Sequence, residues 1–243
     1  MPKSSVPLLH RIKRQLMQLR RQAYGLRMYI PGMRDRHYCE EMIGPLGYWN
    51  ELQRYQMNLL KSNGLQPHHA LLDIGCGPLQ GGIAFIKYLN RNCYTGVDQS
   101  QKPINAGHKL IARHHLGDKE PRLIVSSSFG RDELGTATFD FFWASQILYY
   151  FNDEVLGGLL EMVRQRMRPG GKFLGDFFAL DHFEFHYPEN PGLYFKHTLE
   201  SLQSLADKHG LKVRSLGTIE QYGYPKRLTL HTNLLFEFTA KDA

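Results

Sequence analysis

The chain has 243 residues, of which 42% are hydrophobic and 12% aromatic, and its formal net charge at pH 7 is +7. This composition is typical of a globular domain with a sizeable core and excludes a disordered or fibrous chain. The sequence has no uninterrupted apolar run of the roughly 20 residues that a membrane-spanning helix needs, and its first residues lack the pattern of a secretory signal. The three cysteines, Cys39, Cys76 and Cys93, have no metal-binding spacing. We therefore expect a reduced, cytoplasmic protein without a bound metal or disulfides.

The positive charge is concentrated at the start of the chain. Residues 1–34 contain eight Lys and Arg residues and no Asp or Glu, which leaves 22 basic and 23 acidic residues in the remainder, a net charge of −1. Between residues 8 and 30 the apolar positions follow steps of three and four, which predicts an amphipathic helix with basic outer faces. These positions are Leu9, Ile12, Leu16, Leu19, Ala23, Leu26 and Ile30. We therefore divide the chain into a basic helical appendage, residues 1–34, and a domain, residues 35–243.

Three functions fit this basic helix. It can pack on the core or on a second copy of the chain, which would make a homodimer. It can lie on an anionic membrane surface, at the inner face of the membrane. It can also serve as a cleaved targeting peptide, because it is rich in Arg and free of acidic residues. The sequence leaves these alternatives open.

The rest of the chain alternates short apolar segments with amphipathic ones. A helix is expected over residues 46–64, ended by Asn63 and Gly64. Strands are expected at 70–74, 93–97, 122–126, 139–143, 172–178, 211–216 and 228–238, and further helices at 80–90, 101–115, 153–167 and 198–209. This alternation predicts an α/β fold with a doubly wound, mostly parallel seven-stranded sheet. The last two strands have no helical pattern between them, so the last strand is expected to be antiparallel.

The first strand leads into a glycine-rich turn, LLDIGCGPLQGG, at residues 71–82. A strand, a glycine turn and a helix form the phosphate-binding layout of dinucleotide enzymes. However, Gln80 stands where that motif requires its third glycine, and Pro78 has no N–H to offer a phosphate. The turn therefore favours a nucleoside without a phosphate over NAD. Asp98, at the carboxyl end of the next strand, is placed to accept both hydroxyls of a ribose.

Four motifs follow one another along the domain: LLDIGCGPLQGG, YTGVDQS, FDFFWASQILYYF and MRPGGKFLGDFF. Together they resemble the motif series of Rossmann-type S-adenosylmethionine-dependent methyltransferases, over residues 70–178. The resemblance implies S-adenosylmethionine as the cofactor and S-adenosylhomocysteine as its product. The run from Gly44 to Asn90 is, more loosely, similar to bacterial methyltransferases associated with cell-surface sugar modification.

The resemblance also implies which residues bind the cofactor. The residues of the first motif would lie against the methionine moiety, Asp98 would take the ribose, and Gln99 would lie by the adenine edge. Serines stand where the family usually places an acidic or polar residue for the adenine amine, and the residues after the fourth strand would lie beneath the sulfonium. The full implied set is Asp73, Gly75, Cys76, Gly77, Asp98, Gln99, Ser127, Ser128, Ala144, Ser145 and Gln146.

The acceptor is expected over the loops that follow the fourth and fifth strands and precede the last one. Residues 179–197 are rich in His, Tyr and Phe, whose rings and polar tips suit a sugar, an aromatic acceptor or a cationic amine. The predicted acceptor-binding residues are Tyr149, Tyr187, Tyr194 and Tyr222. An acceptor hydroxyl of high pKa needs a general base, and the candidates are His182, His186 and then Asp176.

The sequence therefore predicts a methyltransferase that methylates an oxygen atom of a small-molecule, glycan or lipid-linked acceptor. Methylation of an amine, of RNA or of a protein, and a non-catalytic protein that binds S-adenosylmethionine, remain alternatives. A nucleic-acid substrate is disfavoured, because the domain lacks net positive charge and has no Asn/Asp-Pro-Pro-aromatic motif after the fourth strand. An NAD-dependent dehydrogenase is disfavoured by Pro78 and Gln80.

Overall fold

The computed structural model describes residues 34–178, 195, 197–228 and 233–241. The chain divides into two compact units, Met1–Trp49 and Asn50–Ala243. The basic helix predicted for residues 8–30 lies outside the described residues. That helix, and the domain boundary predicted after residue 34, therefore stay predictions.

The first unit contains a helix that the apolar pattern did not predict, α2 (Arg34–Ile43). Its sequence, RDRHYCEEMI, is too polar to carry an apolar stripe. Side-chain pairs four residues apart support it instead: Arg36 Nε lies 3.2 Å from a carboxylate oxygen of Glu40, and His37 Nε2 lies 3.3 Å from one of Glu41. The other oxygen of Glu40 accepts the N–H of Gly47 at 3.0 Å.

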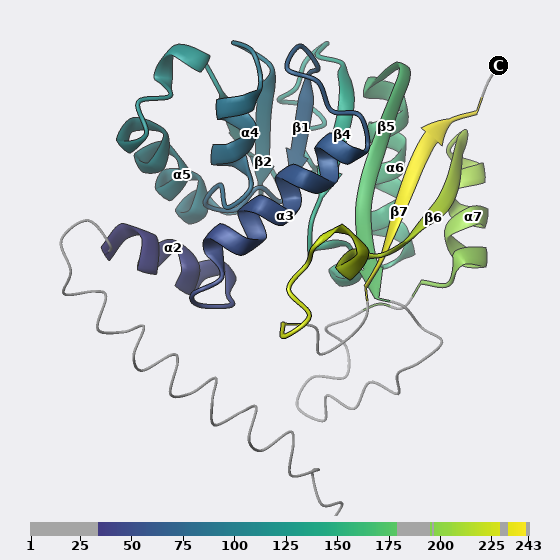
Figure 1. Ribbon diagram of the computed structural model, residues 1–243. Coiled ribbons are helices and arrows are strands. Elements are labelled where there is room, and N and C mark those ends of the chain that lie inside the picture. Colours follow the sequence, from purple (N-terminus) through teal and green to yellow (C-terminus); the bar gives the residue numbers. More distant parts are fainter. Residues whose placement is uncertain (1–33, 179–194, 196, 229–232, 242–243) are drawn as a thin grey trace, which may run out of the picture. The chain divides into compact units, whose positions relative to one another are not determined.

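The second unit contains a seven-stranded sheet in the order β3-β2-β1-β4-β5-β7-β6 (Figure 1). The strands are β1 (Leu71–Ile74), β2 (Tyr94–Asp98), β3 (Arg122–Val125), β4 (Phe139–Ala144), β5 (Met167–Phe178), β6 (Leu211–Thr218) and β7 (Asn233–Ala240). The pairs among β1 to β5 are parallel, and β7 runs antiparallel to both β5 and β6. The predicted doubly wound sheet with an antiparallel last strand is confirmed.

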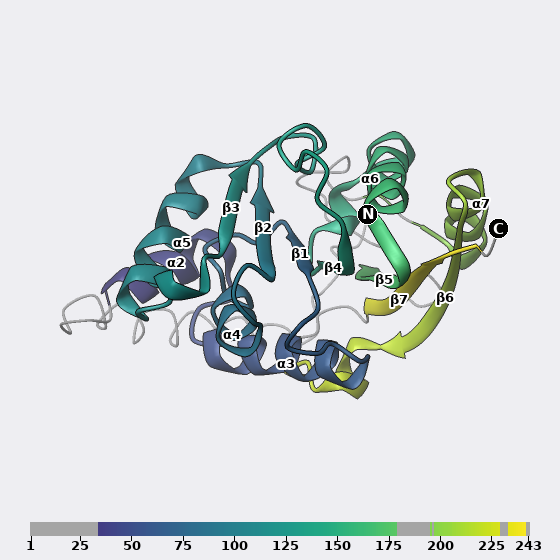
Figure 2. The ribbon, with the colours of Figure 1, turned by 90° about the horizontal axis from the view of Figure 1, so that it is seen from above.

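Helices cover both faces of this sheet (Figure 2). They are α3 (Trp49–Ser62), α4 (Gly82–Tyr88), α5 (Gln101–Arg113), α6 (Asp153–Arg166) and α7 (Leu199–Lys208), with short 3-10 turns η2 (Gly117–Lys119), η3 (Leu148–Tyr150) and η4 (Ile219–Tyr222). The helices α3, α4 and α5 lie on one face, and α6 and α7 lie on the other. None of the helices in the described ranges combines the length and the apolarity that crossing a membrane requires.

The main boundary difference concerns β5, which begins at Met167 rather than at residue 172. Met167 pairs with Phe139 of β4 before the register shifts, so the strand starts on the far side of Gly170. Gly170 has a φ of 75°, a left-handed conformation that glycine adopts without strain. The glycine pair in MRPGG therefore interrupts the strand locally and does not precede it.

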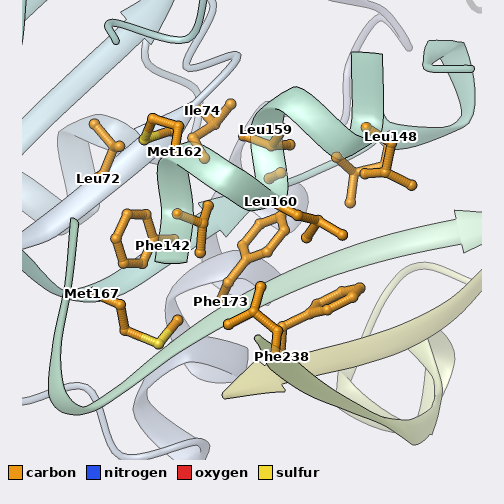
Figure 3. Close-up of a cluster of buried hydrophobic side chains, with 14 of the residues drawn as sticks. Leu72, Ile74, Phe142, Leu148, Leu159, Leu160, Met162, Met167, Phe173 and Phe238 are labelled. Carbon is orange, nitrogen blue, oxygen red and sulfur yellow. The ribbon is translucent and has the colours of Figure 1, made fainter. Parts of the chain in front are cut away.

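The core between the sheet and α6 holds the strands in register (Figure 3). Leu72, Phe142 and Phe173 extend from three neighbouring strands, and Leu159 and Leu160 meet them from α6. All five side chains are fully buried, and burying a Leu or Phe side chain stabilises a fold by about 1.5–3 kcal/mol. Because this core fixes the register of β1, β4 and β5, it also fixes the loops that leave their carboxyl ends.

Candidate active site at the carboxyl edge of the sheet

The register places the ends of four strands in one row. Gly75, which follows β1, lies level with Asp98 at the end of β2 and with Ser145 after β4. Ser145 in turn lies level with Asp176 of β5. The strand order reverses between β1 and β4, and in open α/β sheets ligands bind at such a reversal, outside the carboxyl ends of the strands.

The turn after β1 brings the backbone close to this edge. Gly75 has a φ of 68° and Gly77 one of 52°, which a residue with a Cβ rarely adopts. The N–H groups of Gly75 and Cys76 both donate to the carbonyl of Val97, at 2.8 and 3.1 Å. A Cβ on Gly75 would lie 2.7 Å from Cδ1 of Ile147, in the loop after β4. Glycine is therefore required for the conformation of this turn and for its close packing.

Asp98 is fixed by the same turn. The N–H of Gly77 donates to Oδ2 of Asp98 at 3.0 Å, and the N–H of Ser100 donates to Oδ1 at 2.9 Å. The side chain remains partly exposed. Each carboxylate oxygen therefore keeps a lone pair for one further donor. Two adjacent hydroxyls, such as those of a ribose, match this arrangement.

Asp73 lies two residues deeper in the sheet and in a different environment. It is 5% exposed, and its Oδ2 accepts the hydroxyl of Tyr94 at 2.7 Å. Burial raises the pKa of Asp73 to about 7, although the hydrogen bond from Tyr94 lowers it. At neutral pH this carboxyl group therefore exists in both the charged and the uncharged form.

Cys76 is the member of the turn whose side chain faces inward. It is buried, and a Cβ on Gly96 of β2 would lie 2.9 Å from its Sγ. Burial raises the pKa of the Cys76 thiol well above its usual range. Cys76 therefore presents only its backbone to the edge of the sheet.

The remaining glycines of the turn serve packing rather than a phosphate. The side-chain amide of Gln56, in α3, lies against Gly81. The Nε2 of Gln56 donates to the side-chain oxygen of Gln80 at 3.3 Å, and the Oε1 of Gln56 accepts the indole N–H of Trp143 at 3.0 Å. A Cβ on Gly81 would collide with this amide and would lie 2.9 Å from Cε2 of Phe85. Gly81 therefore serves the close packing of α3 against the turn.

The serines after β3 form a local network, in which the hydroxyls of Ser126 and Ser128 lie 3.1 Å apart. The hydroxyl of Ser126 accepts the N–H groups of Ser128 and Gly130, at 3.2 and 3.0 Å, and so shapes the loop. Ser127 is exposed and Ser128 half-buried. Gln99, predicted for the adenine edge, is exposed beside Asp98.

Asp176 links the residues after β4 to the sheet. Asp176 is fully buried. One of its oxygens accepts the backbone N–H of Gln146 at 2.8 Å. The other accepts the side-chain amides of Gln146 and Asn233. Burial raises the pKa of Asp176 to about 6, against the effect of these donors. Asp176, predicted as a base, thus holds Gln146 in a left-handed conformation with a φ of 58°. Ala144 belongs to the core and reaches the edge only through its backbone.

The predicted acceptor residues are only partly described. Tyr149, in η3, is 8% exposed, and burial raises the pKa of its hydroxyl above the usual range. Tyr222, at the end of η4, is half-buried and donates to the carbonyl of Leu216 at 3.1 Å. The remaining predicted residues, His182, His186, Tyr187 and Tyr194, lie outside the described residues.

Two residues of this edge, Asn233 and Tyr55, were not predicted to belong to it. Asn233 completes the donors around Asp176, and an amide at the start of the strand NLLFEFTA was a signal that could have found it. The rings of Tyr55 and Tyr224 pack edge to face with centroids 5.1 Å apart. Only the fold brings these two tyrosines together, because they are far apart in the sequence.

The residues present fit a nucleoside cofactor with a ribose and no phosphate. Asp98 offers two carboxylate oxygens, and the turn at Gly75–Gly77 approaches the edge without side chains that would block a ligand. These two features fit a ribose, and Pro78 together with Gln80 at the place of the third glycine of the dinucleotide motif argues against NAD.

The family model described as a methyltransferase domain matches residues 72–173. Among solved structures, the chain is similar to an S-adenosylmethionine-dependent methyltransferase from Clostridium acetobutylicum ATCC 824, with a TM-score of 0.60 and 13% identity, over 85% of this chain and 98% of that one. It is similar to magnesium protoporphyrin IX methyltransferase from Synechocystis PCC 6803, solved with bound S-adenosylmethionine, with a TM-score of 0.58 and 12% identity, over 99% and 100% of the two chains. A glycopeptide N-methyltransferase, MtfA, matches with a TM-score of 0.57 and 14% identity, over 77% and 90%.

Proposed function

We propose that this chain, which is an S-adenosylmethionine-dependent methyltransferase of the Rossmann-like class, methylates an oxygen atom of a small-molecule or glycan-type acceptor. The observation that carries the proposal is the division of the sheet edge. Asp98 and the glycine turn lie on the β1–β2 side, whereas Gln146, Asp176 and Tyr149 lie on the β4–β5 side. The first half binds the cofactor, and the second half receives the acceptor.

The residues on the cofactor side act by positioning. S-adenosylmethionine supplies an electrophilic methyl group on a sulfonium. Asp98 would accept the ribose hydroxyls, the backbone at Gly75–Gly77 would hold the methionine moiety, and the carboxyl group of Asp73 would serve its ammonium group. Methyl transfer is an in-line displacement, so alignment and exclusion of water supply most of the rate enhancement.

The described part of the acceptor side carries the rings of Tyr149 and Tyr224, which suit a neutral, hydroxylated acceptor better than a nucleic acid. The oxygens of Asp176 are occupied by three amide donors, so Asp176 is a positioning residue for Gln146. His182 and His186 remain the proposed general bases.

A transfer assay tests the proposal. The protein is incubated with S-adenosylmethionine that carries a labelled methyl group and with cell extract divided into small-molecule, lipid, nucleic-acid and protein fractions. We expect label in the small-molecule or lipid fraction, as a methyl ether by NMR. Asp98→Ala should abolish the transfer, and Asp118→Ala, an exposed aspartate in η2, should not affect it.

Other outcomes of the same assay would contradict parts of the proposal. An N-methyl product would contradict oxygen as the methylated atom. Label in nucleic acid or protein would contradict the acceptor class. Cofactor binding without transfer to any fraction would favour the non-catalytic alternative.

We further propose that residues 8–30, for which the sequence predicts a basic amphipathic helix, bind an anionic membrane surface at the cytoplasmic side, where they would meet a lipid-linked acceptor. The support is the charge of residues 1–34, which contain eight basic and no acidic residues. The full chain should sediment with vesicles containing phosphatidylglycerol, and Arg20→Gln, Arg21→Gln and Arg27→Gln combined should prevent this. Equal sedimentation of both proteins would refute the membrane function and leave self-association or targeting.

A further inference from the structure

Two buried oxygen atoms beside the acceptor half of the edge have no hydrogen-bond partner within the described part of the chain. They are the hydroxyl of Tyr55, in α3, and Oε2 of Glu220, in η4. The Tyr55 side chain is only 2% exposed. A buried polar atom without a partner destabilises the fold, so each such atom requires an explanation. One explanation is that a ligand supplies the missing partners of these two atoms.

Tyr55 and Glu220 belong to elements that pack together. Tyr224 follows η4 closely and places its ring edge-on against the ring of Tyr55, at 5.1 Å between centroids. The N–H of Tyr224 donates to the carbonyl of Ile219 at 3.2 Å, which closes the turn that carries Glu220. In both views the yellow-green segment around η4 lies beside α3 (Figures 1 and 2).

The environment of Tyr55 defines the donor that it offers. Burial, followed by the nearby carboxylate of Asp176, raises the pKa of the Tyr55 hydroxyl, and Glu220 adds to the shift. The hydroxyl is therefore protonated and needs an acceptor atom. Asp176 is already engaged with Gln146 and Asn233. Oε2 of Glu220 has no partner in the described part of the chain, so it can accept a hydrogen bond from a ligand.

We propose that Tyr55 and Glu220 form a subsite that binds a hydroxyl group of the methyl acceptor. The oxygen of that hydroxyl would accept a hydrogen bond from the Tyr55 hydroxyl, and its O–H would donate a hydrogen bond to Oε2 of Glu220. An ammonium group has no lone pair to accept from Tyr55, and an anionic group is repelled by Glu220. The inference rests on the proposed function, because that function assigns the acceptor to this side of the sheet.

The first test is thermal unfolding of the free protein. Tyr55→Phe removes an unpartnered hydroxyl, so its melting temperature should equal or exceed that of the wild type. Tyr88→Phe is the matched control, because the hydroxyl of Tyr88 donates to the carbonyl of Leu65 at 3.1 Å, and its melting temperature should fall. A decrease for Tyr55→Phe as large as that for Tyr88→Phe would show that the Tyr55 hydroxyl is bonded within the chain, and would overturn the subsite.

The second test measures binding of two probes with the same ring by saturation-transfer NMR: trans-1,2-cyclohexanediol and cyclohexylammonium. The protein is titrated with each probe, with and without S-adenosylhomocysteine. We expect the diol to bind the wild type, and Tyr55→Phe and Glu220→Gln to weaken it about tenfold, the equivalent of 1.4 kcal/mol. Tyr88→Phe and Glu200→Gln, an exposed glutamate in α7, should bind the diol as the wild type does.

The outcomes separate the subsite from the proposed function. Diol binding that Tyr55→Phe and Glu220→Gln leave unchanged, or binding of the ammonium probe alone, would overturn the subsite. Failure of S-adenosylhomocysteine to bind the wild type would contradict the proposed function, and the diol titration of the unloaded protein would still decide the subsite.

Discussion

Asp73 and Asp98 lie on adjacent strands but in different surroundings. Asp98 is partly exposed and held by two backbone N–H groups, whereas Asp73 is buried and accepts a hydrogen bond from Tyr94. The pKa of Asp73 is raised from its ordinary value of 3.8 to about 7. At the scale of single residues, the charge of Asp73 therefore depends on pH near neutrality.

This shift predicts how stability depends on pH. Because the folded-state pKa of Asp73 lies above the unfolded value, the folded protein binds more protons between these values. The stability from the protonated carboxyl is fully present below the unfolded pKa and is lost as pH rises through the folded pKa of about 7. Each pKa unit corresponds to about 1.4 kcal/mol. The free energy of unfolding of the wild type should therefore decrease, relative to Asp73→Asn, across this range.

Urea unfolding of both proteins at several pH values measures this difference. Asp118→Asn, an exposed aspartate, is the control and should follow the wild type at every pH. A constant difference between the wild type and Asp73→Asn would mean that Asp73 titrates normally in the folded protein.

Among the elements, α3 contributes most to the shape of the glycine turn. Gln56 joins α3 to Trp143 of β4 and to Gln80 in the turn, and Gln53 donates to the carbonyl of Gln80 at 2.9 Å. Gly81 leaves the space that the Gln56 amide occupies. The helix and the turn therefore depend on each other.

Gly81→Ala should destabilise the protein by about 1–3 kcal/mol, because the added methyl group collides with the amide of Gln56. Combined with Gln56→Ala, it should cost less than the sum of the two single changes. Gly117→Ala is the control, since a Cβ there would meet nothing within 4 Å, and it should be nearly neutral. Additive free energies of unfolding in the double-mutant cycle would show that Gln56 and Gly81 do not interact.

The elements also show what local pattern can predict. The strands were found because each buried strand is a short apolar run between turn residues, and Asp98 was found because a carboxylate at a strand end lies at the sheet edge. The helix α2 was missed because polar side-chain pairs four residues apart support it rather than an apolar stripe. Gln56 was missed because its partner Trp143 is 87 positions away in the sequence, and no local pattern reports such a contact.

At the scale of the whole molecule, the sheet order separates two tasks. The reversal between β1 and β4 places the glycine turn and Asp98 on one side and the residues around Asp176 on the other. The same register that builds the core sets the separation of these two halves. Under the proposed function, the methyl donor and the acceptor would meet near Ser145, which lies between the two halves.

The central claim is that Asp98 binds the ribose of S-adenosylmethionine at this edge, and calorimetric titration tests it most directly. S-adenosylmethionine, S-adenosylhomocysteine and NADH are titrated into the wild type, Asp98→Ala and the control Asp118→Ala. We predict that the first two ligands bind the wild type and the control, that Asp98→Ala weakens them by at least about tenfold, and that NADH does not bind. Binding of NADH, or affinity for S-adenosylmethionine that Asp98→Ala leaves unchanged, would contradict the account.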